Sequence, residues 1–197
     1  MISPEVPVQK TEEVFSKGKL FELIHETQPD GRVFEKARRA PGVRLIISDQ
    51  KSKKVLLTKE FRKELDDWDY RLPGGKVFDT LDEYESFRES RQDILVAARS
   101  KAIEESLQET GIEVSELKQF KKSTLGATVE WDLFVFEVTQ WQHSTIGQQL
   151  EEGEDIDADG WFSYEEVINM ILNGDLKEER IALILLQWIS AQNEGDK

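Results

Sequence analysis

The segment Ile94–Thr110 is predicted to be one helix that ends at Gly111, because glycine readily adopts the left-handed conformation that closes a helix. Segments with the apolar and β-branched composition of strands lie on both sides of it. Two further helices are predicted near the carboxyl terminus, at YEEVINMIL and ERIALILLQWISAQ. Strands and helices mixed in this order predict an α/β sandwich with a mixed β-sheet between helical layers.

Turn residues in the first part of the chain indicate two β-hairpins. The first joins GKLFELIHET to RVFEKARRA at a Pro-Asp-Gly turn, and the second joins GVRLIISD to KKVLLTKEF. A third strand ends at RLPGG, where one proline and two glycines force a loop. Later strands are predicted at IEVSELKQF, VEWDLFVFEV and GWFS. Residues 79–92 are charged and lack clear periodicity, so no element is predicted there.

Composition narrows the class of protein. A chain of 197 residues with 38% hydrophobic residues can form one domain with a real core. The sequence has no signal-peptide pattern and no long apolar run, so we expect a cytoplasmic protein that does not contact membrane. The absence of cysteine excludes disulfides and thiolate metal sites. The net charge of −14 argues against a nucleic acid polymer as partner, because such binding needs many cations to neutralise phosphates.

The basic residues are concentrated in one segment, 36–63, which holds ten lysines and arginines against two acids. The rest of the chain is therefore strongly acidic. One interpretation is that lysines such as Lys51, Lys53 and Lys54 only flank an exposed turn. The other is that Arg39, Arg44 and neighbouring cations bind a small anionic ligand together with metal ions that the acidic part holds.

The predicted helix 94–110 has two chemically different sides. Five apolar residues share one side: Leu95, Val96, Ala102, Ile103 and Leu107. Glu105, Gln108 and Glu109 share the opposite side, which we expect to face solvent. Two glutamates one helical turn apart can reach one Mg²⁺ cluster, since hard cations prefer oxygen ligands. The alternative is an ordinary solvent-exposed ion pair between Lys101 and Glu105.

The Gly-Gly loop, the helix ending in E-T-G-I and the strand after it resemble the Nudix hydrolase family, whose motif is G-x5-E-x7-R-E-U-x-E-E-x-G-U. Anchored on Gly111, the resemblance aligns Glu105 and Glu109 with the two outer metal-binding glutamates of the motif. The sequence departs from the motif at Glu104 and Gln108, which replace an arginine and the middle glutamate. The spacing from Gly75 to the helix is also longer than in the family.

Similarity to the ADP-ribose pyrophosphatase branch of the family extends through Arg38-Arg39, K-E-F-R, L-P-G-G and E-E-G-E-D-I. This resemblance implies an N-terminal arm and β-hairpin over residues 1–40 and a Nudix domain over 41–197, with the arm joining a homodimer. It implies hydrolysis of a nucleoside diphosphate linked to another moiety, as in ADP-ribose or a nucleotide sugar. The products would be a nucleoside monophosphate and a phosphorylated fragment.

The resemblance also implies roles for individual residues. Mg²⁺, or Mn²⁺ in its place, would be held by two helix glutamates, an acidic-loop glutamate and a backbone carbonyl: Glu105, Glu109, Glu154 and Gly74. Glu152 would be the catalytic base, and Arg62 would clamp the diphosphate with Arg39 and Arg44 nearby. Two departures, Arg71 before L-P and S-T-L-G where a S-P-G-like turn is expected, weaken the case for ADP-ribose itself.

Two other functions are compatible with the sequence. Glu104 and Gln108 suit a Nudix-fold domain that binds nucleotide ligands without hydrolysing them. The acidic segment 155–166 also matches a calcium-loop pattern, with acidic ligands at Asp155, Asp157, Asp159 and Glu166 and a glycine at Gly160. The calcium pattern lacks a helix that leads into the loop, which an EF-hand requires.

Overall fold

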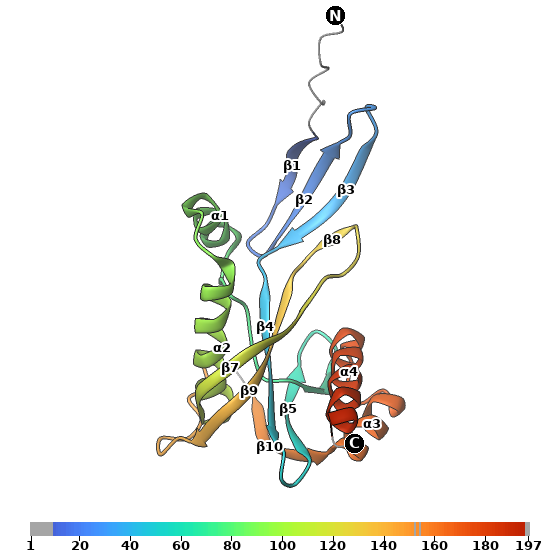
Figure 1. Cartoon of the computed structure of the whole chain (residues 1–197). Coiled ribbons are helices and arrows are strands. Elements are labelled where there is room, and N and C mark those ends of the chain that lie inside the picture. Colours follow the sequence, from blue (N-terminus) through green and yellow to red (C-terminus); the bar gives the residue numbers. More distant parts are fainter. Residues whose placement is uncertain (1–9, 152, 154, 196–197) are drawn as a thin grey trace, which may run out of the picture.

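The computed structural model describes residues 10–151, 153 and 155–195, and it confirms the predicted α/β sandwich (Figure 1). The strands are β1 (Thr11–Lys17), β2 (Phe21–Thr27), β3 (Val33–Arg39), β4 (Gly42–Asp49), β5 (Lys54–Arg62), β6 (Asp67–Arg71), β7 (Ile112–Ser123), β8 (Val129–Glu130), β9 (Leu133–His143) and β10 (Ile156–Ser163). The helices are α1 (Leu81–Ser90), α2 (Ile94–Thr110), α3 (Tyr164–Asn173) and α4 (Glu179–Gly195).

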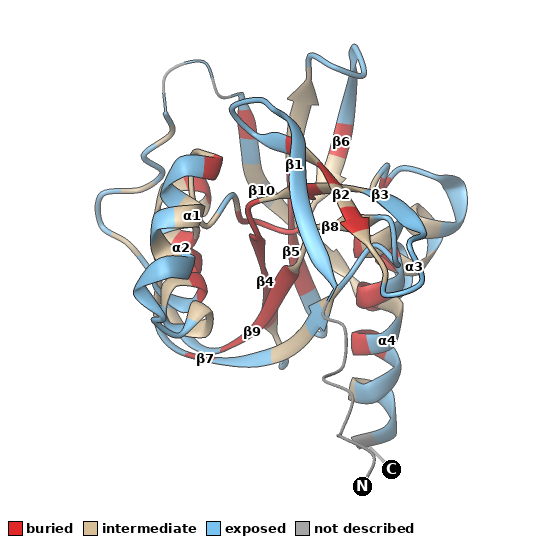
Figure 2. Ribbon diagram, turned by 90° about the horizontal axis from the view of Figure 1, so that it is seen from above, coloured by how far each residue is buried: buried red, intermediate tan, exposed pale blue. Residues whose placement is uncertain are grey.

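The main sheet has the strand order β10-β5-β4-β9-β7, and β6 pairs with β5. It is mixed, because β4 runs parallel to β9 whereas β7 runs antiparallel to β9. Helix α2 lies on one side of this sheet, and α3 and α4 lie on the other (Figure 1). Strand β4 is buried along nearly its whole length, as expected for a strand covered on both faces (Figure 2).

Each face of the sheet has its own hydrophobic core. The core under α2 includes Val43, Leu45 and Ile47 from β4, and the core under α3 and α4 includes Ile46 and the fully buried Trp188. Successive residues of β4 therefore enter opposite cores, as the pleat of a strand requires. These two cores fix β4 between the helices, and the first residues of β4 form the floor of the site described below.

A second sheet, with the order β1-β2-β3-β8, projects from one end of the molecule (Figure 1). The predicted hairpin of β2 and β3 is confirmed, while β1 was not predicted. One face of this sheet carries exposed apolar side chains, namely Phe15, Phe21 and Val33, of which Phe15 is 66% exposed. No strand or helix described for the chain hides these side chains from solvent.

Two further elements differ from the sequence prediction. Helix α1 forms within the segment where no element was predicted, and the Thr80 side chain caps its amino end by accepting from the Glu83 amide. The predicted strand VEWDLFVFEV is two strands, β8 and β9, separated by Trp131 and Asp132. The interruption between β8 and β9 depends on a partner distant in sequence, since β8 pairs with β3.

The buried side of α2 was predicted incorrectly. Of the predicted apolar side, Ala102 is buried, but Val96 is 64% exposed and Ile103 is also exposed. The other buried positions of the helix are Ala98, Ser106 and Glu109. Small residues at these spacings let the helix backbone pack closely against the sheet, so shape rather than hydrophobicity decided which side faces inward. The bounds of α2 are as predicted, and Gly111 adopts the left-handed conformation. The structure adds that the Asp93 side chain caps the amino end.

Candidate functional site

The Leu-Pro-Gly-Gly loop lies along the start of β4. The amide of Leu45 donates to the carbonyl of Pro73, and the amide of Val43 donates to the carbonyl of Gly75, both at 2.9 Å. Gly74 has a φ of +134°, and a Cβ at this position would overlap the Val43 carbonyl. Only glycine fits there, so this residue lets the loop approach β4 closely enough to pair with it.

Glu109 extends from α2 to this loop and is 9% exposed, which contradicts the prediction that it faces solvent. Its Oε2 accepts a hydrogen bond of 2.7 Å from the amide of Gly74. Burial raises the pKa of Glu109 to about 8, although the positive charge of Arg44 and the Gly74 amide oppose this effect. The carboxylate is thus largely removed from the water that would otherwise stabilise its negative charge.

Glu105 lies one turn earlier on the same face of α2. A Cβ on Gly75 would overlap the carboxylate of Glu105, so this carboxylate lies directly against the glycine backbone. Lys101 approaches Glu105 Oε1 at 3.4 Å, which is the ion pair expected from their spacing. The loop glycines and both helix glutamates therefore meet at one place.

Arginine side chains form the wall opposite α2. Arg44, on β4, is buried and donates to the carbonyl of Gly74. Burial and the nearby Arg71 lower the pKa of Arg44 to about 10. Arg62, at the end of β5, and Arg71, at the end of β6, each donate to Glu60 at 2.8 Å. Glu60 therefore fixes the direction of two guanidinium groups at once.

Arg39 reaches the site in a different way. Its guanidinium stacks on the Trp131 ring with 4.2 Å to the centroid, and Arg180 stacks on the same ring at 4.1 Å. Burial, with the repulsion of Arg180, lowers the pKa of Arg39. Within the described part of the chain Arg39 forms no ion pair with a carboxylate, whereas Arg180 pairs with Glu178 at 3.1 Å.

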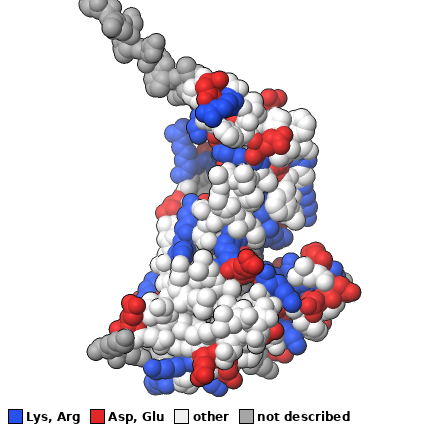
Figure 3. Space-filling view, turned by 90° about the vertical axis from the view of Figure 1, so that its right-hand side faces the viewer, with Lys and Arg blue, Asp and Glu red and all other residues white. Residues whose placement is uncertain are grey.

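These residues line one cavity of about 470 Å³. Six of the eight predicted site residues contribute to it: Arg39, Arg44, Arg62, Gly74, Glu105 and Glu109. Glu152 and Glu154 fall outside the described residues, although Glu151 lines the same cavity. On the face seen in Figure 3, basic and acidic side chains are interspersed, and no broad basic surface is seen there.

The cavity also contains residues that the sequence prediction did not assign to it. Arg71 was noted only as a departure from the family pattern, and Trp131 was placed inside a continuous strand. An arginine directly before the Leu-Pro-Gly-Gly loop was a usable signal, because that loop was already assigned to the site. Trp131 gave no such signal, since its position depends on the interruption between β8 and β9.

The calcium-loop interpretation of residues 155–166 is wrong. Most of this segment is strand β10, which pairs with β5 from Ile156↔Glu60 to Ser163↔Lys54. Glu166, the last residue of the pattern, is engaged in the capping box of α3, where its carboxylate accepts from Ser163. An extended strand cannot wrap its side chains around one ion as a calcium loop does.

The oxygen atoms at the carboxyl end of α2 and in the adjoining Gly-Gly loop are of the kind that suits magnesium. Over residues 10–151, 153 and 155–195, no group of three or more acidic or histidine side chains is arranged to hold a metal ion. Mg²⁺ is usually bound by only one or two carboxylates together with water and substrate phosphates. Glu105, Glu109 and the Gly74 carbonyl supply hard oxygen atoms of this kind.

A family model described as the NUDIX domain matches residues 38–184. The chain belongs to the Nudix family. The matched region includes the Pro-Gly-Gly loop, α2, the arginines of the cavity and α3. Divalent metal ions are typical of this family, in agreement with the donor set at α2.

Two solved structures resemble this one over much of the chain. A crystal structure of an ADP compounds hydrolase superposes with a TM-score of 0.60 at 15% identity, covering 95% of this chain and 98% of that one. A MutT structure, from work on Aliivibrio salmonicida and Vibrio cholerae, has a TM-score of 0.45 at 20% identity and covers 67% of this chain and 85% of that one. Among curated proteins, none matches the sequence. In the described residues, every helix is too short or too polar to cross a bilayer.

Proposed function

We propose that the protein is a Mg²⁺-dependent hydrolase of a nucleoside diphosphate linked to another moiety, of the ADP-ribose or nucleotide-sugar type. The observation that carries this proposal is that carboxylates and guanidinium groups line the same cavity. Glu105 and Glu109 lie against the Gly-Gly loop, and guanidinium groups of Arg39, Arg44 and Arg62 line the same space. Carboxylates suit the metal and guanidinium groups suit a diphosphate.

The reaction adds water to one phosphorus atom and breaks the P–O–P bond, giving a nucleoside monophosphate and a phosphorylated fragment. The bound metal would stabilise the negative charge that develops on phosphate oxygens and lower the pKa of the attacking water. Arg62, oriented by Glu60, would hold the diphosphate, and Arg39 would contact its other side. Arg44 would maintain the loop by donating to the Gly74 carbonyl.

The proton of the attacking water needs an acceptor that does not bind the metal. We assign this role to Glu152 and a further metal-binding role to Glu154, on the basis of the family resemblance. Both residues follow Glu151, which lines the cavity. Glu152→Gln should therefore slow hydrolysis strongly while leaving Mg²⁺ affinity nearly unchanged, whereas Glu154→Gln should weaken both.

The proposed assembly is a homodimer joined through the amino-terminal sheet. Phe15, Phe21 and Val33 are exposed on one face of this sheet, and association of two such faces would remove apolar surface from water. Phe21 also lines the catalytic cavity, so a second copy at this face would lie beside the substrate.

The test is a panel of nucleotide sugars and dinucleotides incubated with Mg²⁺, with released nucleoside monophosphate as the readout. Glu105→Gln and Glu109→Gln should each lower kcat about 10³-fold. Glu104→Gln is the matched control, since Glu104 is an exposed carboxylate on the same helix and does not line the cavity. Binding of these ligands without hydrolysis would instead support the non-catalytic Nudix domain.

A further inference from the structure

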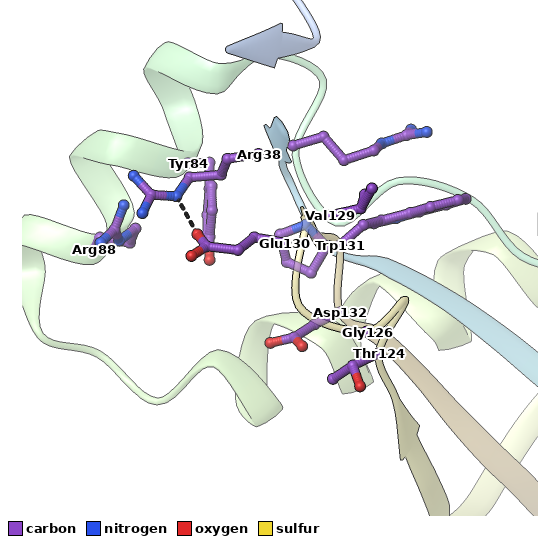
Figure 4. A pocket seen from close by; sticks show the side chains of 11 residues that line it. Arg38, Tyr84, Arg88, Thr124, Gly126, Val129, Glu130, Trp131 and Asp132 are labelled. Carbon is purple, nitrogen blue, oxygen red and sulfur yellow. Dashed lines mark hydrogen bonds and ion pairs between the residues drawn. The ribbon is translucent and has the colours of Figure 1, made fainter. Parts of the chain in front are cut away.

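A second cavity, of about 220 Å³, adjoins the first and shares Arg39 and Trp131 as walls. Its other walls come from the end of β3, the segment leading from β7 into β9, and helix α1, which contributes Tyr84 and Arg88. Figure 4 shows Tyr84 and Arg88 beside the ion pair of Arg38 and Glu130, with Asp132 and Thr124 across the space. We refer to it as the α1 pocket.

Helix α1 lies in the segment that makes the spacing between the Gly-Gly loop and α2 longer than in the family. The rest of the fold holds it firmly. Lys17, at the end of β1, pairs with Asp82 at 2.7 Å and with Glu85 at 2.6 Å. The amide of Leu81 donates to the carbonyl of Lys19, and the Leu81 side chain is fully buried. Tyr84 and Arg88 are thus presented from a fixed scaffold.

The free charge of the α1 pocket is positive. Its carboxylates already have cationic partners, since Glu130 accepts from Arg38 at 2.7 Å and Asp132 pairs with Lys122 at 2.6 Å. Arg88 instead lies over the Tyr84 ring at 5.8 Å and forms no ion pair with any carboxylate that the structure describes. A guanidinium with unused donors beside neutralised carboxylates favours an anionic ligand.

We propose that the α1 pocket binds a phosphate monoester at the far end of the substrate, so that this Nudix protein prefers a nucleoside diphosphate derivative carrying one additional phosphate. The proposal rests on the proposed hydrolysis, because the shared walls let a ligand with its diphosphate in the main cavity extend past Trp131. Arg88 and the Tyr84 hydroxyl would donate to the phosphate, and the Tyr84 and Trp131 rings would contact the attached sugar.

Substrate pairs that differ by one phosphate test the preference directly. ADP-ribose is compared with ADP-ribose 2′-phosphate, and dephospho-coenzyme A with coenzyme A, by kcat/KM for hydrolysis. At least one phosphorylated member should exceed its partner by about tenfold or more, the size expected for one charge-assisted contact. Equal values of kcat/KM within both pairs would overturn the proposal.

Arg88→Ala should bring the ratio within the preferred pair close to one. Arg91→Gly is the matched control, because it removes the same charge from the same end of α1 but outside the pocket. Arg91 has a φ of +57°, which glycine adopts without strain. The control should keep the preference of the unmodified protein. A loss of the preference in both variants would show a long-range charge effect and would contradict a site at Arg88.

A binding measurement separates this proposal from the proposed chemistry. Calorimetry without Mg²⁺ compares adenosine 2′,5′-bisphosphate and 3′,5′-bisphosphate with AMP, so that no hydrolysis is needed. One bisphosphate should bind about tenfold more tightly than AMP, and Arg88→Ala should remove the difference. If AMP binds as tightly as both bisphosphates, the pocket is a nucleobase site or no site. If the difference is found but no substrate is hydrolysed, only the proposed function fails.

Discussion

Two adjacent arginines at the end of β3 have opposite surroundings. Arg38 points into the amino-terminal sheet, where Glu12, Glu22 and Glu130 accept from its three nitrogens at 2.7, 3.2 and 2.7 Å. Arg39 points towards the cavity, where its guanidinium lies over the Phe21 and Trp131 rings and forms no ion pair with a carboxylate of the described residues. The first guanidinium has used its donors within the protein, whereas the second still has donors for a ligand.

The same contrast separates two buried glutamates. Glu26, in the amino-terminal sheet, pairs with Lys36 and Lys10, and these partners lower its pKa to about 2. Glu109, in the Nudix site, accepts from the Gly74 amide, and burial raises its pKa to about 8. In a cluster that only supports the fold, the charged side chains are paired with opposite charges of the same cluster. In the proposed function, Glu109 and Arg39 would instead find their partners in a metal ion and a phosphate.

Alanine substitution of the two arginines gives the largest expected contrast. Arg38→Ala should lower the free energy of unfolding by about 3–5 kcal/mol, because the buried Glu22 would lose its charged partner, which Glu12 and Glu130 also share. Arg39→Ala should change stability by less than about 1 kcal/mol yet lower kcat/KM about 10²-fold. Urea unfolding measures the stability of the two variants, and hydrolysis rates measure their kcat/KM. If the two substitutions lowered stability equally, Arg38 would not support the fold more than Arg39 does.

Glu109→Gln should stabilise the protein at alkaline pH when EDTA keeps metal away. The folded-state pKa of about 8 lies above the unfolded value near 4.5, so the folded state binds this proton more tightly. The resulting stability is complete below about pH 4.5 and is lost as the pH rises through about 8. At pH 9 the variant should therefore be more stable by on the order of a few kcal/mol.

Thermal unfolding at pH 5 and pH 9 checks this prediction. The difference between the variant and the unmodified protein should grow with pH, and Glu104→Gln should show no such trend, because Glu104 is exposed. A variant less stable than the unmodified protein at pH 9 would mean that the charged carboxylate supports the fold. A gain in stability together with a loss of activity is common when a functional residue that destabilises the fold is replaced.

The sequence predicted those parts of the fold that depend on neighbouring residues. Helix α2 begins after Asp93 and ends at Gly111 because both caps act within a few residues. The hairpin of β2 and β3 follows from its own turn. Helix α1 was missed because its only buried residue is Leu81, so its sequence shows no apolar periodicity. Its position is set by Lys17, which is remote in sequence.

The sequence indicated most of the residues that meet in the candidate site, but it did not indicate the burial and charge environment of their side chains. The spacing of Glu105 and Glu109 places both carboxylates near one face of α2, and the structure agrees. The burial of Glu109 could not be foreseen, because it depends on the approach of a loop 35 positions away in the chain. Trp131 was missed for a similar reason, since its stacking between Arg39 and Arg180 joins three separate segments.

The smallest expected effect concerns Gln108, which lies on α2 between the two glutamates and lines the same cavity. Gln108→Glu adds a carboxylate where the described residues offer few metal ligands, so Mg²⁺ should bind a few-fold more tightly and kcat should stay equal or rise. The added charge repels Glu104 one turn away, which should cost about 0.2–0.5 kcal/mol of stability. The measurement is the Mg²⁺ concentration that gives half-maximal activity, with Gln108→Ala as the control for loss of the amide. If Gln108→Glu weakened Mg²⁺ activation, Gln108 would act as a substrate contact, and the metal would lie closer to Glu105 and the Gly-Gly loop.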